Sequence, residues 1–272
     1  MHRLGFIGTG NMGGAMVRAT ANGGYAAECV LANRSFEKAQ ALAQQCGCTA
    51  VHTNEEVAAD AYFILLGVKP FLMAEMLKGI APVLRQRWEK GDRFVLVSMA
   101  AALSIETLKE MAGGEYPVIR IMPNTPCAIG QGMVLVTSDN MATDEEVQQL
   151  CDYLKASGRF DRIDESLMDA GSVIAGCTGA WACMMIEALA DGAVQTGIPR
   201  KKALEYAAQA VKGAAALVLE SGKHPGQLKD EVCSPGGSTI VGVHAMERGG
   251  LRAAAMNAVT EAFEKTKQMR ND

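Results

Sequence analysis

A glycine-rich turn near the start of the chain separates two contrasting segments. Residues 3–7 are apolar and predict a strand, whereas residues 11–22 read as a helix. The turn has the pattern Gly-x-Gly-x-x-Gly, in which the first glycine permits a tight turn, the second lets backbone approach a diphosphate, and the third lets helix and strand pack closely. The helix N-terminus adds free N–H groups and a partial positive charge. The pattern predicts a dinucleotide site at Gly8, Thr9, Gly10, Asn11, Met12 and Gly13.

Strand-like and helix-like segments alternate along residues 1–164. The strand candidates are nearly continuous apolar runs, typical of parallel strands covered on both faces, at 3–7, 29–32, 62–66, 93–97, 118–121 and 133–136. The helix candidates are 11–22, 35–46, 71–86, a helix from Ser104, and 143–156, which opens with a Thr143-x-x-Glu146 capping box. This alternation predicts an α/β Rossmann-like domain with a mostly parallel sheet.

The pattern changes at residue 165. Strand signals end there, and Ala-rich helical stretches occupy 166–196, 199–221, 225–232 and 238–267. We therefore expect two domains, a dinucleotide-binding domain over residues 1–164 and an all-α domain over residues 165–272.

Residues 170–186 form an uncharged run at the short end of what a membrane span requires. The run is flanked by Asp169 and Glu187 rather than by Lys or Arg, and it is rich in small, weakly hydrophobic residues. Small residues recur at every fourth position, at 171, 175, 179 and 183. We expect a helix buried inside protein, with a stripe that lets another helix approach closely, and no association with a membrane.

The end of the second strand candidate predicts which nicotinamide cofactor is preferred. About 20 residues after the glycine turn, NAD-binding proteins often place an acid that binds the ribose diol. This chain has Asn33, Arg34 and Ser35 there instead. A guanidinium binds a 2′-phosphate with two hydrogen bonds, whereas a carboxylate would repel it. We therefore expect NADPH to be preferred over NADH.

Three further loops follow strand candidates, and ligands of open parallel sheets gather at the carboxyl ends of strands. One loop carries Val68, Lys69 and Pro70, the second spans 98–101, and the third carries Met122, Pro123 and Asn124. Their prolines and polar groups are expected beside the nicotinamide and its ribose.

The second half contains one unusual turn, Ser234-Pro-Gly-Gly-Ser-Thr239. Gly236 and Gly237 leave backbone N–H groups bare, and Ser238 and Thr239 add hydroxyls at the start of the last helical stretch. This arrangement suits a small carboxylate. An ordinary N-capped helix start explains the same residues equally well.

Composition and charge exclude several function classes. The chain has 26 basic and 30 acidic side chains, a net charge of −4 and 5% aromatic residues, so it lacks the basic excess and the stacking residues of a nucleic-acid binder. The eight cysteines form no Cys-x-x-Cys pair, and the four histidines do not flank them at zinc-ligand spacing. We expect reduced thiols, no metal site and a cytoplasmic location.

Six motifs occur in the order seen in pyrroline-5-carboxylate reductases, and the chain resembles that family over residues 3–265. They are the glycine turn, the Val-Lys-Pro and Met-Pro-Asn-Thr-Pro loops, Ala-Leu-Ala-Asp-Gly at 188–192, His-Pro-Gly-Gln-Leu-Lys-Asp at 224–230 and Ser-Pro-Gly-Gly-Ser-Thr at 234–239. One departure is Gly176-Cys-Thr-Gly-Ala180, where the family usually reads Gly-Ser-Gly-Pro-Ala.

The resemblance implies reduction of 1-pyrroline-5-carboxylate to L-proline, the last step of proline biosynthesis. It implies that Thr239 hydrogen-bonds the ring nitrogen and acts as the catalytic residue, and that the turn binds the substrate through Ser234, Gly236, Gly237, Ser238 and Thr239. It also implies a homodimer built from intertwined C-terminal helices, and rings of such dimers.

Two alternative functions stay open. The first is a β-hydroxyacid dehydrogenase or another NADPH-dependent imine reductase; dehydrogenases of that type carry a lysine on the first long helix of the second domain, but residues 166–199 contain no lysine or histidine. A C=N bond needs no strong general base for hydride reduction, whereas alcohol oxidation does. The second alternative is a non-catalytic NADPH-binding protein.

Overall fold

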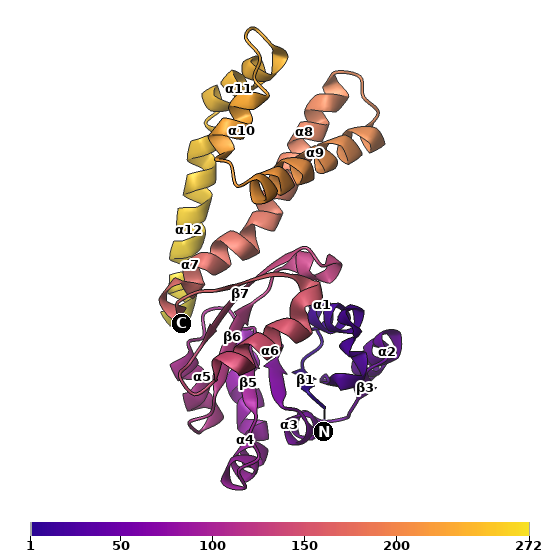
Figure 1. Cartoon of the computed structure of the whole chain (residues 1–272), viewed down its shortest axis with the longest axis vertical. Helices are drawn as coiled ribbons and strands as arrows, with labels where there is room; N and C mark the ends of the chain where they lie inside the picture. The colour runs from indigo at the N-terminus through magenta and orange to yellow at the C-terminus, as the bar shows by residue number, and fades with distance from the viewer. Residues whose placement is uncertain (1, 272) are drawn as a thin grey trace. The chain divides into compact units, whose positions relative to one another are not determined.

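Residues 2–271 are described in the computed structural model of the chain (Figure 1). The chain divides into two compact units, one formed by residues up to Gly176 together with those from Phe263 onward, and one formed by Cys177–Ala262. The predicted boundary at 164/165 lies at the end of the sheet, whereas the units divide twelve residues later, because residues 165–176 pack on the sheet of the first unit. That dinucleotide binding is confined to the residues before this boundary stays a prediction.

A single eight-stranded sheet forms the centre of the first unit, in the order β3-β2-β1-β4-β5-β6-β7-β8. All neighbouring strands pair in parallel except β6 and β7, so the sheet is mostly parallel as expected. The strands are β1 (Leu4–Ile7), β2 (Cys29–Ala32), β3 (Thr49–Ala50), β4 (Phe63–Leu66), β5 (Val95–Ser98), β6 (Val118–Met122), β7 (Gly132–Ser138) and β8 (Gly158–Arg162).

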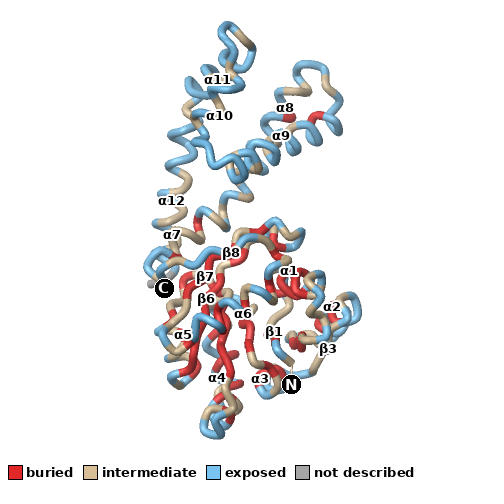
Figure 2. Tube along the Cα trace, in the orientation of Figure 1, coloured by how far each residue is buried: buried red, intermediate tan, exposed pale blue. Residues whose placement is uncertain are grey.

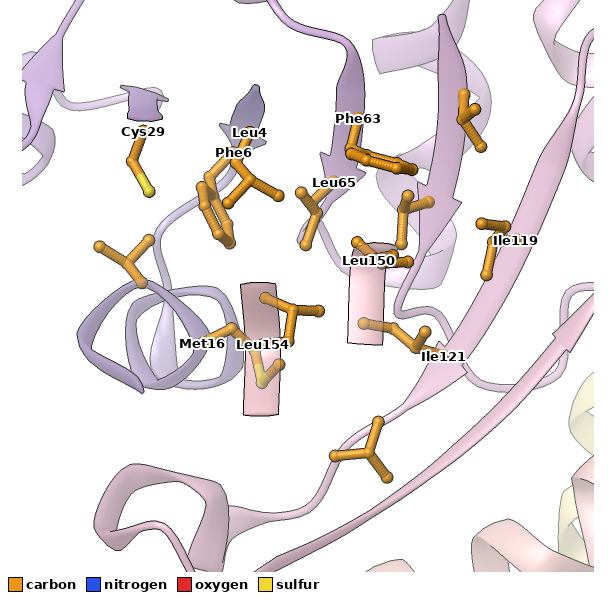
Figure 3. Packing of buried hydrophobic residues seen from close by; sticks show 14 of the residues in the cluster. Leu4, Phe6, Met16, Cys29, Phe63, Leu65, Ile119, Ile121, Leu150 and Leu154 are labelled. Carbon is orange, nitrogen blue, oxygen red and sulfur yellow. The ribbon is translucent and has the colours of Figure 1, made fainter. Parts of the chain in front are cut away.

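Helices cover both faces of this sheet. The face covered by α1 (Asn11–Thr20), α2 (Phe36–Cys46) and α6 (Asp144–Leu154) is packed by alternate strand residues, and Figure 3 shows Phe6, Phe63 and Leu65 facing Met16, Leu150 and Leu154. The opposite face is covered by α3 (Asn54–Asp60), α4 (Met73–Glu89) and α5 (Ile105–Ala112). Burial on both faces explains why the central strands have no polar alternation.

A short irregular helical segment follows the sheet. It consists of a 3₁₀ turn at Glu165–Leu167, α7 (Met168–Ser172) and a π turn at Val173–Cys177. Met168 and Val173 are buried, and a Cβ on Gly171 would lie 2.5 Å from Leu135 Cδ1 of β7. The segment therefore packs tightly on β7 before the chain enters the second unit.

The second unit contains only helices among its described residues. They are α8 (Thr178–Gln195), α9 (Arg200–Ser221), α10 (Pro225–Glu231), α11 (Ser238–Arg248) and most of α12 (Leu251–Asn271). Ala190 and Ala203 are the buried residues of its described chain, and Figure 2 shows its tube mostly in the colour of exposed residues, with intermediate stretches between them. The continuous helical stretch Glu165–Gln195 is long and apolar enough to cross a membrane by length and composition, and 17% of its most apolar window is buried. A single chain thus does not supply the protein burial expected for residues 170–186.

The predicted fold class is confirmed: an α/β Rossmann-like unit precedes an all-helical region. The capping boxes of α6, with Thr143 and Glu146, and of α3, with Thr53 and Glu56, are both present. Three elements were missed, namely β3, α3 and β8, and the predicted helix 238–267 is interrupted by Gly249 and Gly250.

Candidate active site

The first unit brings its predicted cofactor residues to one edge of the sheet. Strands β1, β2, β4, β5 and β6 run in parallel, so the loops that follow them share their carboxyl ends. Backbone bonds continue beyond the strands, from Gly8 N–H to the Ala32 carbonyl (2.9 Å) and from Gly67 N–H to the Ile7 carbonyl (2.8 Å). Four predicted groups meet here: Gly8–Gly13, Asn33–Ser35, Val68–Pro70 and Met122–Asn124.

The three motif glycines have distinct conformational roles. Gly8 has a φ of +91°, which side-chain-bearing residues rarely adopt. A Cβ on Gly13 would lie 2.1 Å from the Gly8 carbonyl oxygen, so only glycine allows α1 to start this close to β1. A Cβ on Gly10 would meet nothing within 4 Å, which leaves the backbone of the turn open to a ligand.

The start of α1 fits a diphosphate. Gly10 is its N-cap, no side chain caps the helix, and its first turn carries no acidic residue. The first amides, of Asn11, Met12 and Gly13, therefore combine with an uncompensated positive helix end. The buried hydroxyl of Thr9 has no hydrogen-bond partner in the described chain, as expected for a group that awaits a polar ligand.

The segment after β2 combines a structural amide with an exposed cation. The Asn33 side chain accepts a hydrogen bond from Thr9 N–H (3.2 Å) and donates one to the Ser35 carbonyl (3.3 Å), so it ties this loop to the glycine turn. Arg34 is exposed. Ser35 is the N-cap residue of α2, but its hydroxyl makes no capping hydrogen bond to the helix and donates to Glu37 (2.9 Å).

Glu37 was missed by sequence reasoning. A hydrogen bond from its own backbone N–H and another from Ser35 hold the pKa of this exposed carboxyl below its usual value. The acid therefore stays ionised beside the cation proposed for the 2′-phosphate. The sequence signal for this hydrogen bond was the position of Glu37, two residues after Ser35 in the first turn of a helix.

The loop after β4 is anchored at its start and open at its end. Val68 packs on the core, and its Cγ1 lies 3.0 Å from the position of a Cβ on Gly8. Lys69 is exposed at the N-cap of a 3₁₀ turn, Pro70–Leu72.

The loop after β5 contains Ala102 with a φ of +62°, the one non-glycine residue with positive φ in the described chain. Backbone strain is therefore stored at this edge of the sheet.

The side chain of Asn124 is fully engaged within the first unit. Its Nδ2 donates to the Ala175 carbonyl (2.8 Å), and its Oδ1 accepts from Met133 N–H (3.1 Å). Pro123 is buried and Met122 is half-buried. The residues Met122, Pro123 and Asn124 therefore offer backbone rather than side-chain groups to a ligand.

The predicted substrate turn lies in the second unit and has the expected open form. Gly236 has a φ of +68°, and Gly237 N–H donates to the Ser234 carbonyl (3.0 Å). Gly237 is the N-cap of α11 and no side chain caps that helix. Ser234, Ser238 and Thr239 are exposed. The alternative explanation was an ordinary N-capped helix start, but neither Ser nor Thr of this turn caps α11 through its side chain.

Other cavities do not coincide with these residues. A groove of about 990 Å³ lies along α6 and β8, and its lining includes Asp144, Glu145 and Asp152. Its acidic rim would repel a dinucleotide diphosphate. Within residues 2–271 no three His, Cys, Asp or Glu side chains come together as a metal site, and all eight cysteines are free thiols.

Comparison with known families follows the same two-part division. A family model for pyrroline-5-carboxylate reductase dimerisation matches residues 165–269, and one described as NADP oxidoreductase, coenzyme F420-dependent, matches residues 3–102. Over 269 residues the chain is 38% identical to pyrroline-5-carboxylate reductase of Escherichia coli, covering 98% of each chain. It is 34% identical over 268 residues to pyrroline-5-carboxylate reductase 3 of Macaca fascicularis, covering 98% of this chain and 96% of the relative.

Solved structures give the same result. A Plasmodium falciparum pyrroline carboxylate reductase, crystallised with NADP bound, is 31% identical with a TM-score of 0.87, covering 99% of this chain and 98% of that one. A pyrroline-5-carboxylate reductase of Coxiella burnetii is 25% identical with a TM-score of 0.89, covering 98% of each chain. The chain therefore belongs to the pyrroline-5-carboxylate reductase family.

Proposed function

We propose that this chain is an NAD(P)H-dependent oxidoreductase that reduces 1-pyrroline-5-carboxylate to L-proline, the last step of proline biosynthesis. The observation that carries the proposal is the end-to-end similarity to relatives of that name, with 38% identity across 98% of both chains. Two open, uncapped helix starts support it, one suited to a dinucleotide and one to a small carboxylate. Residues 166–199 contain no lysine or histidine, which disfavours the alternative of alcohol oxidation.

The cofactor site we propose is the edge of the sheet. The amides at the start of α1 and the Thr9 hydroxyl hold the diphosphate, and Arg34 with Ser35 holds the 2′-phosphate of NADPH, the preferred cofactor over NADH. The backbone of the loops at 68–70 and 122–124 lines the nicotinamide half. NADPH, when bound, supplies the hydride that reduces the C=N bond.

The substrate site we propose is the turn at 234–239. The Gly237 N–H, expected to be bare, is bonded to the Ser234 carbonyl. The first amides of α11, those of Ser238 and Thr239, lie at the positive end of the helix, which favours the substrate carboxylate. Thr239 donates or accepts a hydrogen bond at the ring nitrogen and so orients the imine. Because the imine carbon is already electrophilic once its nitrogen is protonated, these residues act mainly by orientation.

We also propose a cytoplasmic homodimer built from the C-terminal helices, assembled further into a ring of dimers. The second unit buries almost none of its apolar side chains in one chain, and the matching family model describes dimerisation. A second copy is the partner that would cover residues 170–186, in place of a membrane.

The test is a steady-state assay of the purified protein with pyrroline-5-carboxylate and each reduced nicotinamide. We expect turnover with both cofactors and a higher kcat/KM with NADPH. Thr239→Val should lower kcat about ten- to a hundred-fold, the cost of one hydrogen bond to a charged group, while NADPH still binds. Thr49→Val, at an exposed threonine of the edge strand β3 in the first unit, serves as the control and should retain wild-type kcat.

NADPH binding without turnover by the wild-type protein would instead support a non-catalytic NADPH-binding protein. Full activity of the Thr239→Val variant would remove Thr239 from the substrate site and leave the reaction itself standing.

A further inference from the structure

Arg120 is a buried cation in the middle of the sheet. Its side chain is 4% exposed on β6, and the strand register places it between Ser98 of β5 and Thr137 of β7, which are also buried. A guanidinium in such a place is costly unless its partners are well arranged. The proposed cofactor and substrate contacts give it no role, so its partners need an explanation.

The main partner of Arg120 is Glu165, which begins the segment that leads out of the first unit. Arg120 Nη1 donates to Glu165 Oε1 (2.8 Å), and the same oxygen accepts the backbone N–H of Ile105 (2.7 Å). Ile105 is the first residue of α5, so the carboxylate also compensates the positive end of that helix. The Glu165 carboxylate thus links the segment that it begins to β6 and to the end of the loop that follows β5.

A second tie fixes the other end of the same segment, residues 165–176, which we call the stem. The Asn124 amide donates to the Ala175 carbonyl within the π turn, where irregular helix geometry frees carbonyls for outside donors. Between the two ties, Gly171 packs against Leu135 at a distance that a side chain would not allow. The stem is therefore fastened at one end beside the loop 99–104, which follows β5, and at the other end to the loop 122–124, which is proposed to line the nicotinamide half.

The ion pair is poorly explained by stability alone. Arg120 Nη2 lies 4.0 Å from Asp169 Oδ1, too far for a hydrogen bond, and has no hydrogen-bond partner in the described chain. Glu165 is 37% exposed, so only the arginine of the pair is buried, and well-packed apolar residues of similar volume often replace a buried ionic group and its partner without loss of stability. Apolar residues lack directed hydrogen bonds, so they cannot hold β6, the start of α5 and the stem in one fixed orientation.

We propose that Arg120 and Glu165 form a clamp that positions the stem and the loops 99–104 and 122–124 for hydride transfer. The inference rests on the proposed reductase function. Arg120 is a positioning residue in this proposal, because it reaches the reaction only through the elements it joins. Its loss should therefore slow the chemical step without weakening the adenine-side anchors of the cofactor at Gly8–Gly13 and Arg34.

The experiment measures kcat, the Kd for NADPH, and the kinetic isotope effect with NADPH deuterated at the transferred position. For Arg120→Met we expect kcat to fall about a hundred-fold, the scale of a misplacement near 1 Å, with an unchanged Kd and a larger isotope effect as hydride transfer becomes rate-limiting. Arg120→Lys should restore part of kcat, because an ammonium can pair with Glu165. Glu165→Gln should change kcat and the isotope effect in the same directions, but less, again with an unchanged Kd, and it serves where Arg120→Met does not fold.

The matched control is Arg87→Met. Arg87 is another buried arginine, 5% exposed, and it bonds to Asp92 and to the carbonyls of Ala58 and Ala61, away from the edge loops. Its loss should lower Tm but leave kcat per folded site and the isotope effect unchanged. The proposal is overturned if Arg120→Met behaves like this control, or if its Kd for NADPH rises in step with the loss of kcat. An inactive wild-type protein would contradict the proposed function instead.

Discussion

At the scale of single residues, the cofactor choice that we propose depends on two opposite charges in one short segment. Arg34 is an exposed cation, and Glu37 is an ionised acid that already accepts the Ser35 hydroxyl. At the proposed site, binding of a 2′-phosphate by Ser35 would break its hydrogen bond to Glu37 and would have to overcome the repulsion of that carboxylate. In this proposal, Arg34 is therefore the residue on which a preference for NADPH depends.

Replacement of Arg34 by Asp should raise the KM for NADPH by about ten- to a hundred-fold, since a charged hydrogen-bond donor is lost and a repelling charge is gained. The KM for NADH should change much less, because NADH has no 2′-phosphate. Steady-state kinetics with both cofactors measure the difference. Lys38→Asp makes the same charge change four residues along the chain at an exposed position and should affect both cofactors little; an equal effect of Arg34→Asp on the two would remove Arg34 from the site.

The sequence predicted the groups that are open to a ligand better than the side chains that hold the loops in place. The glycines at 8, 10 and 13 were predicted from a local pattern: backbone geometry demands Gly8 and Gly13, and Gly10 leaves the turn open. The side chains of Asn33 and Asn124 were expected to face the cofactor, but both are occupied by hydrogen bonds to neighbouring loops. Arg120 and Glu165 are 45 residues apart, so no local pattern pairs them; the available signal was a charge inside the buried strand Val-Ile-Arg-Ile.

At the scale of elements, the start of α6 is fixed by one carboxylate. Glu146 accepts hydrogen bonds from Thr143 N–H (2.8 Å), from Tyr62 Oη (2.5 Å) and from two nitrogens of Arg93 (2.8 and 2.9 Å). Burial by itself raises the pKa of this carboxyl, but the bonds from Arg93 and Tyr62 outweigh it, so the pKa lies below its usual value. The ionised form is thus the one that the fold stabilises.

The lowered pKa of Glu146 determines the direction in which the stability of the fold changes with pH. Because the pKa of Glu146 is lower in the folded than in the unfolded chain, its contribution to stability is complete above the unfolded pKa, about 4.3, and is lost as the pH falls through the folded pKa. Glu146→Gln should cost about 2 kcal/mol at pH 7 and should flatten the fall in stability below pH 4.3. Urea unfolding at several pH values measures both. Glu145→Gln changes an exposed neighbour and should match the wild type; an identical acid profile of Glu146→Gln and wild type would contradict the assignment.

Elements were predicted where a long apolar pattern marks them and missed where it does not. The continuous runs that became β4, β5 and β6 are buried on both faces. β3 has two residues and β8 reads Gly-Arg-Phe-Asp-Arg, because edge strands are short or charged. α3 is seven residues long, and its Thr53-x-x-Glu56 capping box was its one clear signal.

At the scale of the whole molecule, the second unit lacks a core of its own. Residues 214–219 of α9 read Ala-Ala-Ala-Leu-Val-Leu and are apolar around the whole helix, a pattern of buried helices. Yet Leu217 and Leu219 are 51% and 63% exposed in a single chain. Exposed apolar surface on this scale marks an interface, and the matching dimerisation family model points to a second copy of the chain.

If the helices of the second unit gain their core from a second copy, folding and assembly are linked by mass action. The Tm should then rise with protein concentration, because dimerisation stabilises the folded chain. Leu219→Asp would be harmless on a free surface, but in a dimer core it buries an unpaired charge, so it should lower both the molar mass in sedimentation equilibrium and the Tm. Ile129→Asp, which changes an apolar residue of the first unit that is even more exposed (76%), should leave the molar mass unchanged. A monomer whose Tm is independent of concentration and insensitive to Leu219→Asp would contradict the proposed dimer, because the helices would then be stable with their apolar faces in water.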